Sequence, residues 1–203
     1  MGIQGTQKLD EWFRNARDNA DLVQEDWTDW VEKVAPNKRT VVIFASGASL
    51  KLHEKYMPSI AKHCTCIMGP TTAPWFYHHA GRAPDLVGNV DKSETLSEMC
   101  KVLPPDQNYL LSPIVHPSWR DVPGRKFWFL NGIQGPSGAL MEHPFTLGLV
   151  KFFYNIDTLI AQMGCITNEL IWLVHLALAH LRASEIVLAG ADYCFWKGYA
   201  RIP

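Results

Sequence analysis

Residues 40–49 are Thr40-Val41-Val42-Ile43-Phe44-Ala45-Ser46-Gly47-Ala48-Ser49, and this stretch decides the fold. Its first six residues form a nearly continuous β-branched and apolar run, which is typical of a strand covered on both faces, as in a parallel sheet. The run breaks at Ser46-Gly47-Ala48-Ser49, and residues 50–63 then have the pattern of a helix. The stretch therefore predicts the first strand, turn and helix of an α/β domain.

The alternation of strand and helix continues along the chain. Further strands are predicted at residues 64–68, 85–90, 108–111, 126–130 and 185–189, and further helices at residues 72–80, 145–163 and 168–181. We therefore predict an α/β fold of the Rossmann-like, doubly wound type with a mostly parallel sheet. The predicted nucleotide-binding domain spans residues 38–203. A loop rich in Gly, Pro and Ser at residues 132–138 is its candidate for a mobile lid.

Residues 1–37 form a predicted N-terminal helical extension. From Leu9 to Val34 the apolar residues recur every three or four positions, which predicts one long amphipathic helix. Its apolar stripe carries Trp12, Trp27 and Trp30. Two roles are open for this stripe: packing against the core of the same chain, or joining copies of the chain into a homo-oligomer.

Composition argues against several classes of function. The chain has 19 Lys and Arg residues against 20 Asp and Glu residues, so no overall positive field attracts nucleic acid or anionic lipid. No apolar run approaches the ~18 residues that a membrane-spanning helix needs, and the N-terminus lacks the pattern of a signal peptide. The five cysteines form no C-x-x-C pair, which favours reduced thiols in the cytoplasm. We expect a cytoplasmic protein with no nucleic-acid or membrane partner.

The turn after the first strand is the first candidate site. Gly47 would let backbone N–H groups approach a phosphate, and the following helix would direct its positive end toward that anion. Ser46 or Ser49 can add a hydroxyl, and Ala48 lies between them in the turn. The turn matches neither of the longer glycine-rich phosphate motifs. The alternative is a plain tight turn before a helix.

Two acids follow predicted strands at the carboxyl edge of the sheet, where open α/β folds bind their ligands. Asn89-Val90-Asp91 closes one strand, and Gly190-Ala191-Asp192-Tyr193 follows the last one. Asp91 and Asp192 at one edge would form a site for Mg²⁺ and phosphate, because Mg²⁺ prefers hard oxygen ligands. The alternatives are an N-cap formed by Asp91 or Ser93 at the start of the next helix, and a turn residue for Asp192.

His116 is the candidate general base. It precedes a proline, as His143 does, so both are expected in extended or loop segments. Near neutral pH a histidine can accept a proton or contact a phosphate. An ordinary surface or hydrogen-bonded role is the alternative for each.

These pieces occur in the order of a known family. Residues 41–50, 84–91 and 186–192, with Gly164 to Asn168 opening an apolar helix, resemble the 6-hydroxymethylpterin diphosphokinase family of the MptE-like type. The resemblance implies a Rossmann-like fold and Mg²⁺-dependent transfer of diphosphate from ATP to the hydroxymethyl group of a reduced pterin. It also implies that Gly47 and Ser49 contact phosphate, and that Asp91 and Asp192 hold metal or substrate. Ala48 departs from the pattern, since the family usually has proline there.

The same motifs are similar to those of sialyltransferase-like and motility-associated glycosyltransferases. That resemblance implies that Tyr193 or Tyr199 contacts the nucleotide and that a histidine is the base. We expect a nucleotide-dependent transferase that uses ATP or another nucleotide together with a small-molecule acceptor. Mg²⁺-dependent diphosphate transfer is the first hypothesis, glycosyl transfer from a nucleotide-sugar the second, and a non-catalytic nucleotide-binding or assembly module the third.

Overall fold

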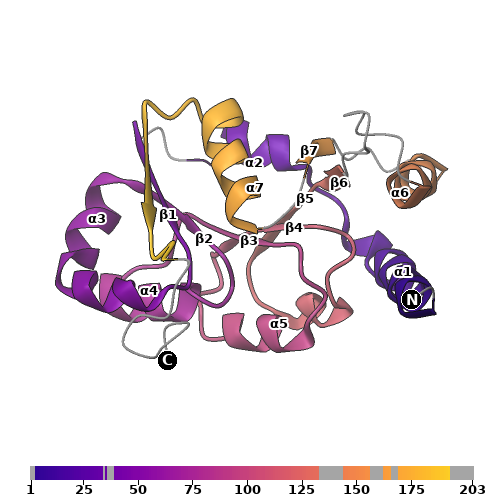
Figure 1. The fold of residues 1–203 in the computed structure, drawn as a ribbon, viewed down its shortest axis with the longest axis horizontal. Helices are drawn as coiled ribbons and strands as arrows, with labels where there is room; N and C mark the ends of the chain where they lie inside the picture. The colour runs from indigo at the N-terminus through magenta and orange to yellow at the C-terminus, as the bar shows by residue number, and fades with distance from the viewer. Residues whose placement is uncertain are drawn as a thin grey trace.

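The sheet predicted from the sequence is present in the computed structural model, which describes residues 3–33, 35, 39–132, 144–155, 162–165 and 169–192. Six strands form one parallel sheet in the order β5-β4-β3-β2-β1-β8 (Figure 1). A separate parallel pair joins β6 and β7. The strands are β1 (Thr40–Phe44), β2 (Thr65–Met68), β3 (Leu86–Asn89), β4 (Asn108–Leu111), β5 (Arg125–Trp128), β6 (Leu130–Gly132), β7 (Gln162–Cys165) and β8 (Glu185–Ala189). The α/β, Rossmann-like prediction is confirmed.

Helices cover both faces of the sheet. In Figure 1, α4 and α5 lie below the sheet and α3 lies at its left, all on one face, whereas α2 and α7 lie above it on the other face. The helices are α1 (Ile3–Asp18), η1 (Ala20–Leu22), α2 (Trp27–Lys33), η2 (Ala48–Tyr56), α3 (Met57–His63), α4 (Ala73–Ala80), α5 (Glu94–Cys100), η3 (Pro117–Asp121), α6 (Pro144–Asn155), α7 (Glu169–His175) and η4 (Leu176–His180). Within the described ranges, no helix is long and apolar enough to cross a membrane.

The strand order identifies where the sheet changes direction. From β1 to β5 the chain adds one strand after another toward one edge, and it then returns to place β8 on the other side of β1. The topological switch point therefore lies between β1 and β8. In open α/β sheets the ligand crevice lies at such a point, beyond the carboxyl ends of the strands.

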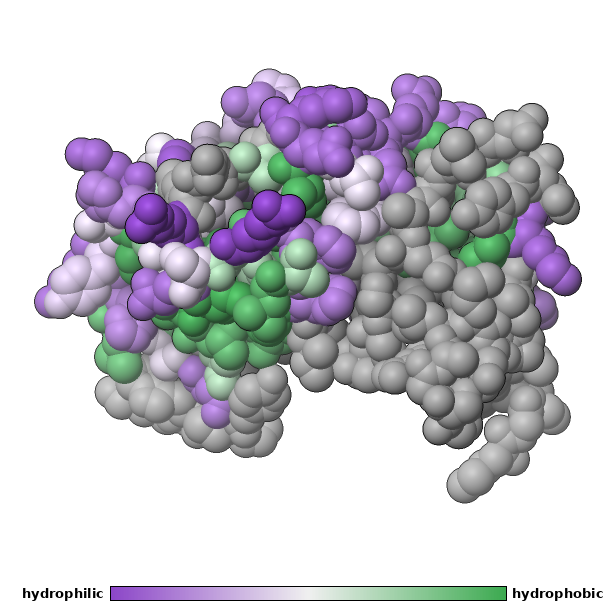
Figure 2. Space-filling view, turned by 90° about the horizontal axis from the view of Figure 1, so that it is seen from above, coloured by the Kyte–Doolittle hydropathy of each residue, from purple (hydrophilic) through white to green (hydrophobic). Residues whose placement is uncertain are grey.

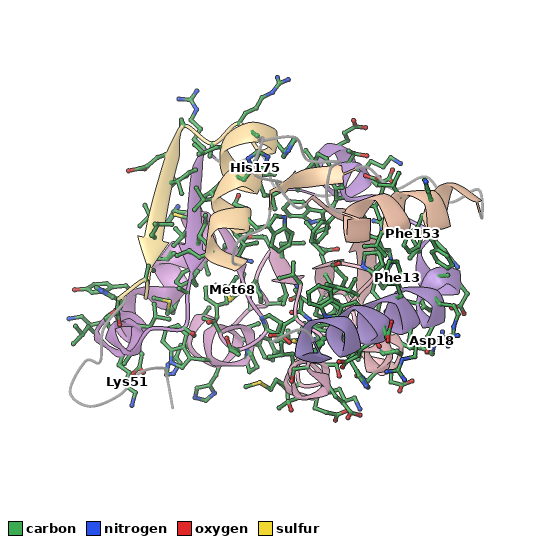
Figure 3. All side chains as sticks on the ribbon, turned by 45° about the vertical axis from the view of Figure 1, so that its right-hand side comes forward. Phe13, Asp18, Lys51, Met68, Phe153 and His175 are labelled. Atoms are coloured by element: carbon green, nitrogen blue, oxygen red, sulfur yellow. The ribbon has the colours of Figure 1, made fainter. Side chains whose placement is uncertain are left out.

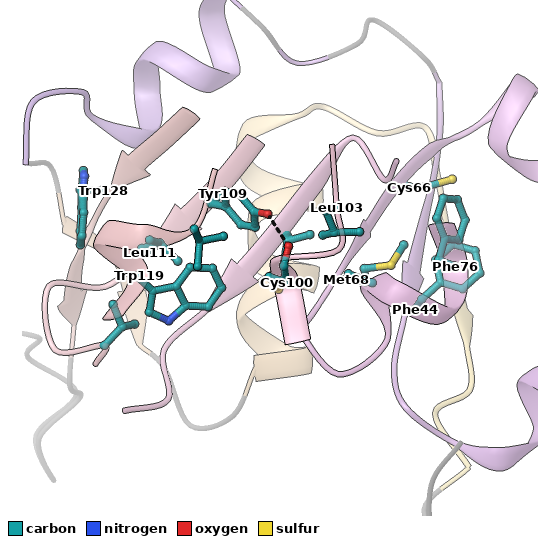
Figure 4. Packing of buried hydrophobic residues seen from close by; sticks show 14 of the residues in the cluster. Phe44, Cys66, Met68, Phe76, Cys100, Leu103, Tyr109, Leu111, Trp119 and Trp128 are labelled. Atoms are coloured by element: carbon teal, nitrogen blue, oxygen red, sulfur yellow. Dashed lines mark hydrogen bonds between the residues drawn. The ribbon is translucent and has the colours of Figure 1, made fainter. Parts of the chain in front are cut away.

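Two hydrophobic clusters fill the space between the sheet and its helices. In the cluster of Figure 4, the rings of Phe44 and Phe76 lie 5.2 Å apart, and the hydroxyl of Tyr109 donates to the carbonyl of Cys100. Burial raises the pKa of the Tyr109 hydroxyl. In the cluster on the opposite face, Trp172 of α7 stacks on Phe129 at 4.6 Å. The predicted burial of β1 on both faces is confirmed, since its four residues after Thr40 are buried.

The single long N-terminal helix of the prediction is not present. Instead α1 ends at Asp18, and α2 begins at Trp27. Between them the carbonyl of Glu25 accepts the backbone N–H of Trp128 at 2.8 Å, so the chain runs along the edge strand β5. Ala16 then packs in one cluster, whereas Trp27 and Trp30 are buried in the other. We call residues 3–33 the N-terminal strap, because they wrap around this edge and reach both faces.

Side-chain contacts hold the N-terminal strap in place. Phe13 points toward α6, where Phe153 is buried (Figure 3), and a Cβ added to Gly148 would lie 2.7 Å from the Phe13 ring. The Arg125 guanidinium donates to the Glu25 carboxylate and holds the pKa of that acid below its usual value. The periodic pattern of the strap is real, but its apolar residues face two different layers of the molecule.

Other helix predictions need smaller corrections. The segment after β1 begins as the 3₁₀ helix η2, and α3 starts near Pro58, which lacks the N–H that would continue the helix. The predicted helix at residues 145–163 ends at Asn155, because Gln162 and Met163 pair with β6. The helix predicted at 168–181 continues as a π-helix in which Leu178 is 62% exposed. The predicted lid at residues 132–138 lies outside the described residues except for Gly132.

The β8 edge of the sheet is open among the described residues. Val187 is 41% exposed and Leu188 is 49% exposed, although both belong to an apolar strand. Figure 2 shows a green, hydrophobic area left of centre, on the side where Figure 1 draws β8. The two edges of the sheet therefore differ, since the strap covers β5.

Candidate functional site

The turns after β1 and β8 meet at the switch point. The N–H of Gly47 donates to the carbonyl of Gly190 at 2.8 Å, and Ala45 makes the corresponding bond to Ala189. A Cβ on Gly47 would lie 2.6 Å from an oxygen of Asp192. Gly190 has a φ of +69°, in the left-handed region that favours glycine. Both glycines are therefore required by the close approach of the two turns.

The carboxylate of Asp192 binds the beginning of η2. The backbone N–H of Ser49 donates to Asp192 Oδ2 at 2.9 Å, and the Ser49 hydroxyl donates to Oδ1. A carboxylate is stabilised at a helix N-terminus by the unpaired N–H groups and the helix dipole. Asp192 thus occupies the donors that the sequence assigned to a phosphate, and a phosphate would have to bind beside this acid.

The other predicted turn residues lie around this contact. Ala48 is buried as the first residue of η2, and Ser46 is half-buried just after β1. The structure brings Ser46, Gly47, Ala48 and Ser49 together with Gly190 and Asp192, and their role in binding a nucleotide stays a prediction. Tyr193 and Tyr199, which the resemblance assigned to the nucleotide, lie outside the described residues.

Asn89 and Asp91 form a local cap at the end of β3. The buried Asn89 side chain accepts the N–H of Asp91 at 2.9 Å and donates to its carbonyl at 3.0 Å. Asp91 is exposed, and its Oδ1 accepts the N–H of Ser93, the N-cap residue of α5, at 2.8 Å. The N-cap residue of α5 is therefore Ser93, and Asp91 closes a short turn before the helix.

Asp91 and Asp192 occupy different places at the carboxyl edge. Their strands, β3 and β8, are separated by β2 and β1. Three strand spacings amount to roughly 14 Å, which is too far for both carboxylates to bind one Mg²⁺ ion. Among the described residues, no group of three or more His, Cys, Asp or Glu side chains could hold a metal. On this spacing, Asp91 and Asp192 would each have to bind a separate Mg²⁺ ion.

His116 lies beyond β4 and caps η3. Its Nδ1 accepts the N–H of Ser118 at 3.2 Å and lies 2.8 Å from the Ser118 hydroxyl. That hydroxyl is 2.6 Å from the hydroxyl of the buried Ser97, which donates to the Glu94 carbonyl. Because Nδ1 accepts from a backbone N–H, the proton of the neutral ring is assigned to Nε2. His143, the other proline-flanked histidine, lies outside the described residues.

A cavity of about 320 Å³ lies at the opposite, amino edge of the sheet. Arg82, which lines it, already donates to Asp85 and to the carbonyls of Ala61 and Ala83. Its lining residues are Arg82, Ala83, Pro84, Asp85, Asp106, Gln107 and Asn108. It contains none of the predicted site residues.

Comparisons with solved structures find a similar fold. No family model matches the chain, and no curated protein matches it. The MAf glycosyltransferase from Magnetospirillum magneticum AMB-1 superimposes with a TM-score of 0.59 and 12% identity over 92% of this chain. The chain spans 27% of the length of that protein. A second alignment, to CurK enoyl reductase, has a TM-score of 0.27, which is too low to indicate a shared fold.

The similarity to the MAf glycosyltransferase shows the fold of this chain, since 12% identity does not extend to chemistry. The similarity therefore does not decide between the glycosyltransferase and the diphosphokinase sides of the resemblance. Sequence reasoning missed Asn15 and Asn19, two buried amides of the strap that donate to carbonyls just before His116. Their only signal was two polar residues four positions apart beside the apolar stripe.

Proposed function

We propose that this chain is the nucleotide-binding part of a transferase that moves a glycosyl group from a nucleotide-sugar to a small-molecule acceptor. The observation that carries the proposal is the Asp192 carboxylate, held by Ser49 at the switch point between β1 and β8. Open α/β sheets bind ligands at this place. The similarity in fold to a glycosyltransferase supports this choice among transferases.

Asp192 suits a ligand that brings hydroxyl groups. Each of its oxygens accepts one hydrogen bond from Ser49, and a carboxylate oxygen has capacity for a second. An ionised carboxylate attracts hydroxyl donors and repels a bare phosphate. The hydroxyl groups of a ribose or a sugar are therefore better neighbours for Asp192 than the triphosphate of ATP, which favours a nucleotide-sugar.

Diphosphate transfer from ATP is the second candidate, and it depends on magnesium. Mg²⁺ is commonly bound by one or two carboxylates together with substrate phosphates, and Asp192 is a carboxylate in the required place. When bound there, the ion would supply positive charge that neutralises the phosphates. Asp91 would need a separate ion. This candidate is supported by Asp192 and by the resemblance in sequence.

The cysteines agree with a cytoplasmic location, which belongs to the same proposal. Cys64, Cys66 and Cys100 form no disulfide in the structure, and the last two are buried. Thiols of this kind persist in a reducing compartment, where nucleotide co-substrates are also found.

Thermal unfolding with nucleotides tests the proposal. We expect CMP, CDP or UDP to raise the melting temperature more than ATP does. A ligand that binds only the native state stabilises it by about 2.7 kcal/mol when present at 100 times its Kd. Asp192→Asn should remove most of that shift, whereas Asp91→Ala, the matched control, should keep it. An ATP shift that requires Mg²⁺ and Asp192 would favour diphosphate transfer. Folded wild-type protein that responds to none of these nucleotides would contradict both candidates.

A further inference from the structure

Three consecutive backbone carbonyls before His116 are held by two asparagines of the N-terminal strap. Asn19 Nδ2 donates to the carbonyls of Pro113 and Val115, each at 2.9 Å. Asn15 Nδ2 donates to the carbonyl between them, that of Ile114, at 3.0 Å. Asn15 is 7% exposed and Asn19 is fully buried. Breaking such buried bonds is costly because the carbonyls would lose their partners, so the strap fixes the path of this loop.

The strap also contacts η3, which follows the loop, and the segment between β3 and α5. Arg120 of η3 donates to both carboxylate oxygens of Asp21, at 2.9 and 3.0 Å, and to the carbonyl of Asp18. Lys92, next to Asp91, pairs with Glu11 of α1. Exposed ion pairs contribute little individually, so the buried amides of Asn15 and Asn19 are the main constraint.

The ring of His116 is held in one tautomer. Ser118 donates its backbone N–H to Nδ1, and this requires a lone pair on that nitrogen. In the neutral ring the proton is then on Nε2. Within the described part of the chain, Ser118 is the one residue that hydrogen-bonds the His116 ring. Nε2–H therefore remains available as a donor to a bound molecule.

We propose that Asn15 and Asn19 are positioning residues that place His116, and that His116 offers its Nε2–H group to an oxygen of the acceptor substrate. In this tautomer Nε2 has no lone pair, so His116 serves as a hydrogen-bond donor in place of the general base predicted from the sequence. The assignment of the acceptor substrate as the bound molecule rests on the proposed function. The positioning of the ring rests only on the hydrogen bonds made by Asn15, Asn19 and Ser118.

Nitrogen NMR of the histidine rings tests the positioning, with the His116 signal assigned from a His116→Gln variant. At a pH where the ring is neutral, we expect wild-type His116 to be protonated on Nε2. Asn15→Ala removes one of the three carbonyl bonds and should move both ring shifts toward a mixture of tautomers. Asn19→Ala removes two bonds and should do so further, if it folds. Arg17→Ala, which breaks an exposed ion pair with Asp18 on the same helix, should leave the ring unchanged.

Kinetics test the role in transfer. We expect Asn15→Ala to lower kcat by roughly 10-fold without changing the KM for the nucleotide, because small displacements of a positioned group slow the reaction. A wild-type ring protonated on Nδ1, or an unchanged ring in folded Asn15→Ala, would overturn the positioning. A displaced ring with an unchanged kcat would overturn the donor role. If no nucleotide proves to be a substrate, the ring spectra still decide the positioning.

Discussion

The two halves of the carboxyl edge are built in different ways. On the β1 and β8 side, Asp192 binds Ser49 across 143 residues of sequence. On the β3 side, Asp91 binds Ser93 and Asn89, each two residues away. Both acids follow a strand, and in the sequence they look alike. The distant pair joins two segments at the switch point, whereas the local contacts end a strand and begin a helix.

The role of an acid that follows a strand therefore depends on the group to which it is hydrogen-bonded. A local cap satisfies backbone groups wherever the helix occurs. A contact between distant turns requires the sheet, two glycines in close approach and the order of the strands. The Asp192 half is therefore the better candidate for ligand binding, and four experiments with five substitutions test that distinction.

Gly47→Ala should have the largest effect. Its Cβ would lie 2.6 Å from Asp192 Oδ2 and even nearer to the backbone oxygen of Gly190, which cannot move alone. We expect a loss of about 3 kcal/mol in the free energy of unfolding, measured by urea denaturation. A cost near zero would mean that the two turns do not meet as described.

Gly190→Ala and Gly81→Ala form a matched pair. Their φ values, +69° and +71°, are nearly equal, so an alanine at either position should lower the free energy of unfolding by about 1 kcal/mol through its left-handed backbone. A Cβ on Gly190 would also lie 2.8 Å from the carbonyl oxygen of Ala45, whereas one on Gly81 meets nothing within 4 Å. We expect Gly190→Ala to cost about 1 kcal/mol more in the same denaturation experiment. Equal costs would remove the evidence for a crowded switch point.

Asp192→Ala should destabilise the protein by about 2 kcal/mol, because the Ser49 N–H and hydroxyl lose a charged acceptor. It should also free those donors for an anion. We expect inorganic phosphate to bind this variant more tightly than the wild type, as measured by titration calorimetry. Equal phosphate affinity in both proteins would mean that Asp192 does not occupy an anion site.

Asp91→Ala should have the smallest effect. Loss of the hydrogen bond from the Ser93 N–H should cost about 1 kcal/mol, as the loss of one such bond generally does. The stabilisation that a nucleotide gives should be unchanged, which melting curves with and without the nucleotide would measure. Loss of that stabilisation would place Asp91 in the binding site and erase the difference between the two halves.

Much of the sheet could be predicted from the sequence because its strands are short apolar runs. Residues 40–45 and 108–111 are examples, and their burial follows directly from composition. β7 could not be predicted, since Gln162 and Met163 continue a helical pattern until β6 supplies partners for their backbone groups. The break in the strap was missed for the same reason, because the partner of Glu25 is Trp128.

The candidate site was predicted in part. Gly47, Ser49 and Asp192 were chosen because open α/β sheets bind ligands at strand ends, and the fold brings the three residues together, while their role in binding stays a prediction. Their mutual contact could not be predicted, since it depends on β8 lying beside β1. The polar pair Asn15 and Asn19 could not be assigned a role from the sequence, because their acceptors are backbone carbonyls nearly a hundred residues later.

The N-terminal strap also sets an order of events during folding. Asn19 is 94 residues from Pro113, and Glu25 is 100 residues from Arg125, so these bonds close very long loops. During synthesis, on the order of ten seconds would separate the strap from its partners. Until β5 is made, α2 lacks the strand against which it packs, and Trp27 and Trp30 expose apolar surface that chaperones can bind. Pulsed hydrogen exchange should find the amides of α2 protected later than those of β1.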